Sequence, residues 1–304
     1  MNQRSGTRLS DTGRRSLGLG LWWLAIRPRT LSLSAIPVLV GSALAWSEGA
    51  AIAWPPLVVA LLCALLIQAG TNLFNDVGDA LRGNDGPTRL GPVRVTAAGL
   101  ATPGQVRRAA LATFLAALLG GLYLVWYGGW PILLIGLASL IAGWAYSGGP
   151  RPLSYTAWGE VFVMGFFGLV AVAGSHFLQS DRFTATALVA GLALGCHAAA
   201  VLLVNNVRDL EADRRAGRST LASVVGTHAA RRLYAGLMLA PFPLLSTLLG
   251  ATRLGPAWLA LPLCLWLAWR FLDLPPGAHM NAQLARTAQA QFLLGALLCA
   301  ALLM

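Results

Sequence analysis

Lysine is absent from the sequence, and all 22 basic residues are arginines. A lysine Schiff base or a lysine nucleophile is therefore excluded. Charged residues of both signs are scarce, at 11% of the 304 residues, whereas a typical soluble domain has about 25%. Hydrophobic residues make up 57% of the chain, and the mean hydropathy is +0.66. So few polar groups cannot cover a water-facing surface, and the composition favours an integral membrane protein.

Cysteine is scarce as well, and its positions indicate no redox or metal chemistry. Cys63, Cys196, Cys264 and Cys299 each lie within an apolar run and form no CxxC pair, which is typical of small core residues. The net charge of +11 does not indicate a nucleic-acid partner, because the arginines stand in short loops and form no basic domain.

Nine long apolar runs account for most of the chain. Each is about as long as a helix needs to be to cross a bilayer. The runs lie near residues 30–47, 52–76, 103–126, 130–146, 157–178, 184–206, 229–250, 255–272 and 285–304. None alternates like a barrel strand, and lipid leaves helices as the other spanning structure. The sequence therefore predicts an all-α integral membrane protein with nine transmembrane helices.

The arginines predict how these helices are oriented. With the N-terminus in the cytoplasm, the inside segments hold 20 of the 22 arginines, and the outside loops hold only Arg182 and Arg253. This asymmetry predicts a multi-pass protein of the cell (inner) membrane whose C-terminus lies outside. Residues 1–20 are polar and lack the apolar stretch of a secretory signal. We expect a disordered cytoplasmic tail there, followed by one transmembrane domain over residues 21–304.

Acidic residues are the rarest charged group, and their positions indicate a functional site. Six of the eleven fall in two inside loops at the ends of apolar helices. They are Asp76, Asp79, Asp85, Asp209, Glu211 and Asp213. A carboxylate at a membrane edge is costly to desolvate, which makes a functional role the default hypothesis.

Helical spacing places oxygen ligands on one face of each segment, because residues three, four and seven apart share a face. The residues that satisfy this spacing are Asn72, Asn75, Asp76 and Asp79 in the first segment, and Asn206, Asp209 and Asp213 in the second. Residues 75–79 and 205–209 also share the pattern N-[DN]-V-x-D. This similarity predicts an internal repeat, which in membrane proteins often frames a central site.

The two carboxylate clusters contain no histidine or cysteine, and such oxygen ligands suit Mg²⁺. The neighbouring arginines suit phosphate oxygens. They include Arg82, Arg151, Arg208 and Arg218. Together with the apolar helices, these groups predict a substrate with a diphosphate head and a lipid tail. Metal and arginines would stabilise the departing diphosphate.

These segments resemble the UbiA superfamily of intramembrane aromatic prenyltransferases. Residues 75–85 (NDVGDALRGND) are similar to its first aspartate-rich motif, and residues 209–220 (DLEADRRAGRST) are similar to its DxxxD motif. The stretches 27–30, 91–96, 146–152 and 159–162 resemble the branch that acts on 1,4-dihydroxy-2-naphthoate in menaquinone synthesis. The chain departs from the commoner NDxxDxxxD pattern, because Gly83 stands at the third acidic position and Asp85 follows two residues later.

The resemblance implies a helical bundle around a central cavity open to lipid, with its active-site loops in the cytoplasm. It implies transfer of a polyprenyl group from an allylic diphosphate to 1,4-dihydroxy-2-naphthoate, with loss of CO₂ and diphosphate. The metal ligands would be Asp76, Asp79, Asp209 and Asp213, and Asp85 would be a further ligand. The groups that support them or bind the diphosphate would be Asn72, Asn75, Asn205, Asn206, Arg27, Arg82, Arg151, Arg208 and Arg218.

Several roles and two other functions stay open from the sequence. Tyr146 and Tyr155 either face the allylic cation or belong to an interfacial belt. Glu160 either deprotonates or orients the naphthoate, or it pairs with Arg151. His197 either lines the cavity or is a hydrogen-bonded residue of the interior. The acceptor could instead be 4-hydroxybenzoate, homogentisate or a porphyrin. A secondary transporter would also show repeats and intramembrane acids, although nearer the middle of the membrane.

Overall fold

The computed structural model describes residues 11–83, 90–148, 152–253 and 255–304, with the backbone alone given for 11–17 and 248–253. These residues form helices joined by loops, and no strand occurs among them. Asp85 and Arg151, which the sequence places in the site, lie outside the described residues. So do positions 1–10 of the predicted tail, and the first helix, α1, already begins at Asp11.

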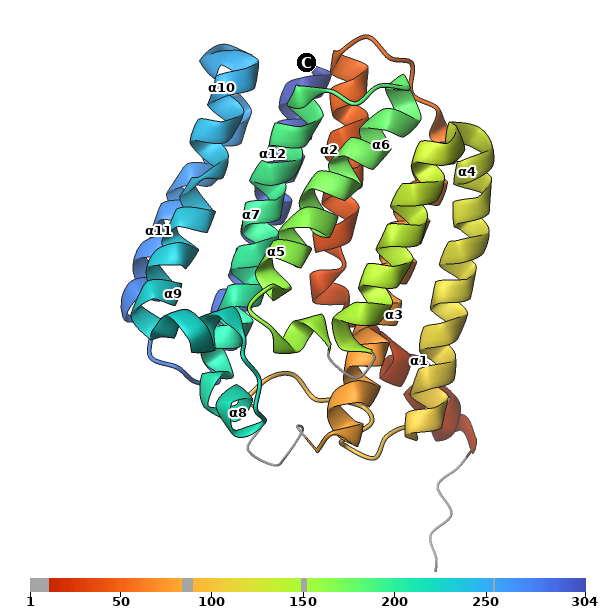
Figure 1. Ribbon diagram of the computed structural model, residues 1–304, viewed down its shortest axis with the longest axis vertical. Coiled ribbons are helices and arrows are strands. Elements are labelled where there is room, and N and C mark those ends of the chain that lie inside the picture. Colours follow the sequence, from red (N-terminus) through yellow and green to blue (C-terminus); the bar gives the residue numbers. More distant parts are fainter. Residues whose placement is uncertain (1–10, 84–89, 149–151, 254) are drawn as a thin grey trace, which may run out of the picture.

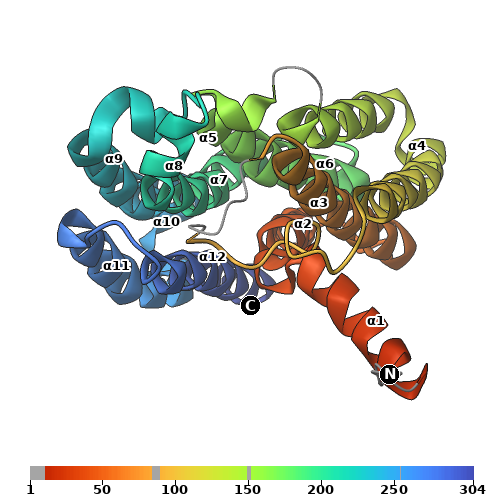
Figure 2. The same ribbon diagram turned by 90° about the horizontal axis from the view of Figure 1, so that it is seen from below.

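The helices stand side by side in one bundle (Figures 1 and 2). Its first half contains α1 (Asp11–Ile26), η1 (Pro28–Thr30), α2 (Ser32–Ser47), α3 (Trp54–Leu81), α4 (Pro103–Ser147), η2 (Leu153–Tyr155), α5 (Gly159–Met164), the π-helix η3 (Gly165–Val170) and α6 (Ala171–Ser180). The second half contains α7 (Ala185–Arg208), α8 (Leu210–Arg215), α9 (Leu221–Leu239), α10 (Pro241–Arg253), η4 (Gly255–Ala260), α11 (Leu261–Asp273) and α12 (Met280–Leu303).

Each of the nine predicted runs overlaps a described helix. By length and apolarity, six helical segments of the described chain qualify as membrane spans, or seven if the bent pair Gly18–Thr30 and Ser32–Ser47 is one span. The helical, multi-pass character of the chain is thereby confirmed. The number nine, the orientation and the internal repeat stay predictions.

The helix α4 contains two of the predicted runs. Its backbone turns at Gly129, with φ 71° and ψ −158°, and Pro131 follows. A positive φ is accessible to glycine at little cost, so this position permits the turn. The two arms of α4 run antiparallel on either side of it (Figure 1).

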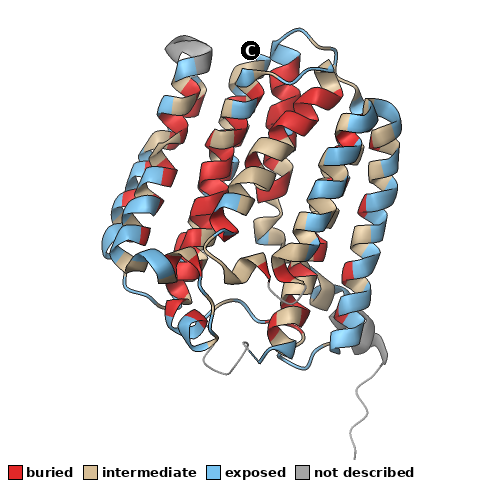
Figure 3. Cartoon of the chain, viewed as in Figure 1, coloured by how far each residue is buried: buried red, intermediate tan, exposed pale blue. Residues whose placement is uncertain are grey.

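The centre of the bundle is α7. In its most apolar stretch of 18 residues, 78% of the residues are buried, whereas the corresponding share in α4 is 17%. Figure 3 shows the buried residues gathered on α2 and α7, with exposed residues along α4. Lipid therefore faces α4. The helix α7 runs through the middle of the protein, and its polar C-terminal residues lie at one end of the bundle.

Small residues let η3 cross α7 closely. A Cβ atom built on Gly168 would lie 2.3 Å from the carbonyl oxygen of Gly191 and 2.6 Å from the Cα of Gly195. Glycines at such a crossing allow two helix backbones to approach within a membrane.

Replacing Gly168 with alanine should therefore destabilise the protein by about 1–3 kcal/mol, because neither backbone can yield locally. The measurement is thermal unfolding of the purified protein in detergent. Gly236→Ala in α9 is the matched control, since a Cβ atom added at Gly236 would have no neighbour within 4 Å. Equal unfolding temperatures for Gly168→Ala and the wild type would contradict the close crossing.

Candidate functional site

A cavity of about 920 Å³ lies inside the bundle. Most of its wall is apolar and comes from α1 to α7 and α12, including Phe162, Phe166 and Phe167. Polar groups also line it, from the ends of α1, α3, α4 and α7 and the start of α12. They include Arg27, Asn72, Asn75, Tyr146, Asn205, Arg208 and Asn281. The cavity thus offers apolar space for a lipid tail and polar groups for a head group.

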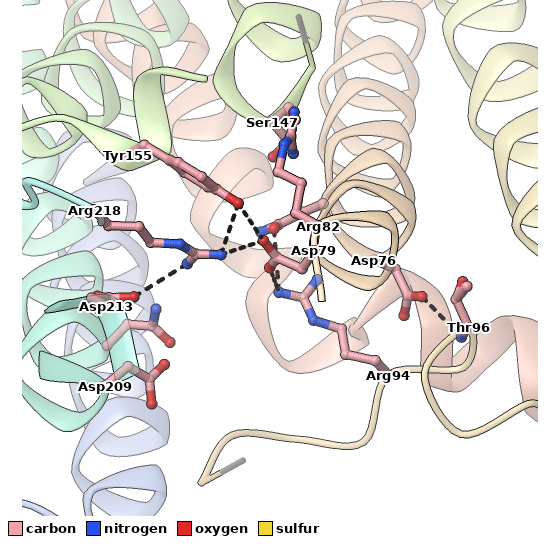
Figure 4. A network of polar contacts seen from close by, with 12 residues as sticks. Asp76, Asp79, Arg82, Arg94, Thr96, Ser147, Tyr155, Asp209, Asp213 and Arg218 are labelled. Carbon is pink, nitrogen blue, oxygen red and sulfur yellow. Dashed lines mark hydrogen bonds and ion pairs between the residues drawn. The ribbon is translucent and has the colours of Figure 1, made fainter. Parts of the chain in front are cut away.

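Asp79 lies at the centre of a charged network beside these polar groups (Figure 4). It is 4% exposed and occupies the last turns of α3. Arg94 forms an ion pair with its Oδ2 atom, and Arg218 forms one with its Oδ1 atom. The Tyr155 hydroxyl donates to Oδ1 across 3.4 Å. A carboxylate so buried is stabilised by these two guanidinium groups, which hold it in one orientation.

Arg218 connects the first aspartate motif to the second. Besides Asp79, its Nη1 atom contacts Asp213 Oδ1 at 3.3 Å, and its Nη2 atom donates to the Tyr155 hydroxyl at 3.2 Å. Its guanidinium carbon lies 4.2 Å from the centre of the Tyr155 ring. Burial raises the pKa of the Asp213 carboxyl to about 6, although the charge of Arg218 opposes the shift. Asp79 and Asp213 are 134 residues apart in sequence, yet both contact one cationic group.

Asp76 faces a different way from Asp79. Its Oδ2 atom accepts the backbone N–H of Val95 at 2.9 Å, and its Oδ1 atom accepts that of Thr96 at 3.0 Å. Figure 4 shows this carboxylate turned toward Thr96 and away from Asp209 and Asp213. In the structure, therefore, Asp76 anchors the loop that carries Arg94, and its predicted role as a metal ligand stays a prediction.

Arg208 organises the second motif. Its Nε atom donates to Asp209 Oδ1 at 2.8 Å, and its Nη2 atom donates to Asp209 Oδ2 and to Asn205 Oδ1, each at 2.6 Å. Its Nη1 atom donates to Asn281 Oδ1 at 2.6 Å. The helical face predicted for residues 206–213 is interrupted, because α7 ends at Arg208 and α8 begins at Leu210.

The other predicted residues fall into two groups. Near the network, Asn75 accepts from Arg94 Nη2 at 3.2 Å, and Arg82 Nη1 donates to the Ser147 carbonyl at 3.3 Å. Asn72 donates to the Ile26 carbonyl at 2.8 Å, which ties α3 to α1. Further along the bundle, Asn206 donates to Glu160 Oε1 at 2.8 Å.

The residues left open by the sequence are placed as follows. Tyr146 lines the cavity, whereas Tyr155 belongs to the Asp79 network. Glu160 is buried beside Asn206 and is not among the lining residues. His197 is an interior histidine, because it is fully buried and its Nε2 atom lies 3.1 Å from the Met238 carbonyl oxygen.

Two contributors to the site were missed by sequence reasoning. Arg94 stands within a stretch that resembles the naphthoate branch, and that stretch was the available signal for it. Asn281 at the start of α12 carried no signal. Its side chain accepts from Arg208 and donates to the Leu90 carbonyl at 2.8 Å, so it joins α7 to the loop before Arg94.

The donor set fits a divalent cation that is completed by its substrate. Among the described residues, no three histidine, cysteine or acidic side chains gather closely enough to hold a metal by themselves. Asp79 and Asp213 nevertheless share one cationic group, Arg218, whose buried Nε atom has no hydrogen-bond acceptor within the described chain. Mg²⁺ keeps waters and substrate phosphates in its shell, so two carboxylates with a nearby phosphate suffice.

Comparison with known proteins gives concordant results. The profile of the UbiA prenyltransferase family matches residues 34–303. A 1,4-dihydroxy-2-naphthoate octaprenyltransferase of Escherichia coli is 38% identical over 226 residues, which cover 72% of each chain. One of Mycobacterium tuberculosis is 38% identical and is matched over 71% of this chain and 74% of its own. A UbiA homolog from Archaeoglobus fulgidus, bound to DMAPP and Mg²⁺, superposes with a TM-score of 0.66 at 16% identity, covering 92% of this chain and 98% of its own.

Proposed function

Because the chain belongs to the UbiA prenyltransferase family, we propose that it transfers a polyprenyl group from an allylic diphosphate to 1,4-dihydroxy-2-naphthoate. The products would be demethylmenaquinol, diphosphate and CO₂. The acceptor is supported by the names of relatives from several bacteria at 32–38% identity. The structural observation that carries the proposal is an apolar cavity whose polar residues lie beside the Asp79–Arg218–Asp213 network.

The arrangement assigns a part to each group in binding. The polyprenyl tail would lie along the apolar wall of the cavity, and the diphosphate would lie among its polar residues. Arg208 and Arg218 would donate to the phosphate oxygens, since a guanidinium offers paired donors to such groups. Bound Mg²⁺, held by Asp79 and Asp213 and also by Asp76 and Asp209 if these turn inward, would neutralise charge on the departing diphosphate.

The reaction breaks the bond between the allylic carbon and the diphosphate oxygen, and the bonding electrons leave with the diphosphate. The naphthoate carbon that bears the carboxylate supplies the electron pair of the new carbon–carbon bond. Loss of CO₂ from that carbon then restores the aromatic ring. Tyr146 lines the cavity where its ring can face the allylic cation. The apolar wall excludes water that would otherwise quench this cation.

The test is a prenyl-transfer assay on the full chain in detergent. Geranylgeranyl or farnesyl diphosphate and Mg²⁺ would be supplied with 1,4-dihydroxy-2-naphthoate or 4-hydroxybenzoate. The expected product, detected by mass spectrometry, is the decarboxylated prenyl-naphthoquinol, or its quinone after oxidation by air. Transfer to 4-hydroxybenzoate alone would support prenyl transfer but contradict 1,4-dihydroxy-2-naphthoate as the acceptor. Failure to bind a prenyl diphosphate at all would favour the transporter alternative.

Asn281 should set the affinity for the diphosphate. Asn281→Ala removes the acceptor of Arg208 Nη1. A hydrogen bond to a charged group contributes about 1.5–3 kcal/mol, so we expect KM for the prenyl diphosphate to rise at least about tenfold, with a smaller change in kcat. Asn281→Asp keeps an acceptor for Arg208, and its KM should lie between those of the wild type and Asn281→Ala. An unchanged KM in the alanine variant would show that Arg208 is held without Asn281.

We also propose that the active-site end of the bundle faces the cytoplasm, as the arginine distribution predicts. Accessibility of a single cysteine placed at exposed Arg214, in a chain otherwise free of cysteine, is the measurement. Labelling by a membrane-impermeant reagent only after the cells are opened would support this orientation. Labelling of intact cells would contradict it.

A further inference from the structure

Two arginines each lie near the ring of one partly exposed tryptophan, Trp266, in the second half of the bundle. The guanidinium carbon of Arg270, on α11, lies 5.3 Å from the centre of the Trp266 ring. The guanidinium carbon of Arg286, on α12, lies 5.1 Å from the same ring. A cation held at this distance from an indole is attracted by the electrons of its face. The Trp266 ring therefore has a guanidinium group from each of two helices beside it.

Within the described chain, neither charge is neutralised. No ion pair or hydrogen bond joins Arg270 or Arg286 to another described residue, although Asp273 is three residues from Arg270. Arg231 on α9 is different, because it donates to the carbonyls of Leu272 and Leu274. Two like charges near one ring repel each other, and an anion within reach of both would lower that cost.

The surroundings of this pair are those of a lipid-facing surface. Large apolar side chains on the same two helices are exposed, including Leu265 at 48%, Trp269 at 69% and Phe292 at 51%. Both arginines are half-buried within helices that qualify as membrane spans. Ionisable residues in such helices are costly and are retained where they meet a partner or a functional group.

The position along the helices fits a lipid head group. Arg270 lies three residues before the end of α11, and Arg286 lies five residues after Asn281, which contacts Arg208. Both therefore lie toward the end of the bundle that carries the aspartates (Figure 1). Tryptophan is enriched at this depth, where its ring meets the head groups. Basic pockets between membrane helices on the cytoplasmic side bind anionic head groups.

We propose that Trp266, Arg270 and Arg286 bind the phosphate of an anionic phospholipid in the leaflet that contains the active-site loops. The guanidinium groups donate to the phosphate oxygens, and the exposed apolar side chains of α11 and α12 contact the acyl chains. The site is separate from the cavity, since none of these three residues lines it. It adds lipid recognition to the proposed prenyl transfer and does not depend on it.

The experiment is native mass spectrometry of the full chain, released from detergent and titrated with phosphatidylglycerol or phosphatidylcholine. We expect the wild type to retain phosphatidylglycerol in preference. The Arg270→Gln/Arg286→Gln double variant should bind it about 25-fold more weakly, because each arginine near an anionic surface contributes ~1 kcal/mol and about 1.4 kcal/mol is tenfold. Phosphatidylcholine binding should not change.

The matched control is Arg182→Gln/Arg232→Gln, which removes two exposed arginines elsewhere. An equal loss of phosphatidylglycerol in this control would overturn the proposal in favour of diffuse attraction. Displacement of the lipid by the same concentration of inorganic phosphate would also overturn it, because the acyl chains would then contribute nothing. Equal thermal unfolding of both double variants in phosphatidylcholine nanodiscs verifies that they are folded. The Arg270→Lys/Arg286→Lys variant keeps the charge and should restore most of the affinity.

Discussion

Replacing Asp79 with asparagine should lower kcat/KM for prenyl transfer by about a thousandfold, the loss expected when a main electrostatic contact to the reacting group is removed. Asp79 is the one described residue that pairs with both Arg94 and Arg218, and Asp213 joins it through the latter. Asparagine has nearly the same shape but no charge. It leaves the buried Arg94 and the half-buried Arg218 without their shared anion and removes a ligand from the proposed metal site.

Asp181→Asn is the matched control for this variant. Asp181 is exposed, follows α6 at the other end of the bundle and contacts no described part of the site. Its kcat/KM should equal that of the wild type. Thermal unfolding of Asp79→Asn separates lost chemistry from lost structure, because a folded but inactive variant is expected. Activity within tenfold of the wild type in folded Asp79→Asn would remove Asp79 from the mechanism.

Removing divalent metal should lower the rate of prenyl transfer at least as much as Asp79→Asn does. With EDTA present, we expect prenyl transfer to fall to background, because the diphosphate would leave without a metal to neutralise its charge. The cationic group that joins Asp79 to Asp213 in the structure is Arg218, and its single positive charge is half that of a divalent ion. The measurement is initial rate against free Mg²⁺ concentration, at a fixed concentration of prenyl diphosphate.

Restoring Mg²⁺ in excess of EDTA is the control and should return the full rate. In Asp213→Asn the same titration should need more Mg²⁺, since one ligand is weakened, whereas in Asp181→Asn it should match the wild type. An undiminished rate in EDTA would contradict the metal-dependent mechanism. The arginines alone would then stabilise the leaving diphosphate.

The sequence was sufficient to predict those features of the structure that depend on one segment of the chain alone. Apolar length decides which segments become helices in lipid, because the backbone has no other way to satisfy its hydrogen bonds there. The predicted runs at 184–206 and 285–304 accordingly coincide with α7 and α12, apart from their ends. The scarcity of acids made Asp79 and Asp213 conspicuous, and the structure places both in one network.

Spacing along a helix was insufficient to say where each carboxylate points. Asp76 and Asp79 were expected to share a face, yet one accepts amides of the loop at 95–96 and the other pairs with Arg94 and Arg218. They are three residues apart, and the angle of about 60° between them suffices for two different neighbours. Which neighbour each one meets depends on how the following loop returns over α3.

By itself, therefore, the sequence determined a helical membrane protein with a polar site between two aspartate motifs. Only the tertiary structure decided the partners: Arg218 with Asp79 across 139 residues, Asn281 with Arg208 across 73, and Arg286 with the Trp266 ring. The physical reason is that composition and periodicity act within one segment. A contact between distant segments is fixed by the packing of the whole bundle, which joins α7 to α12 and the loop after α8 to α3.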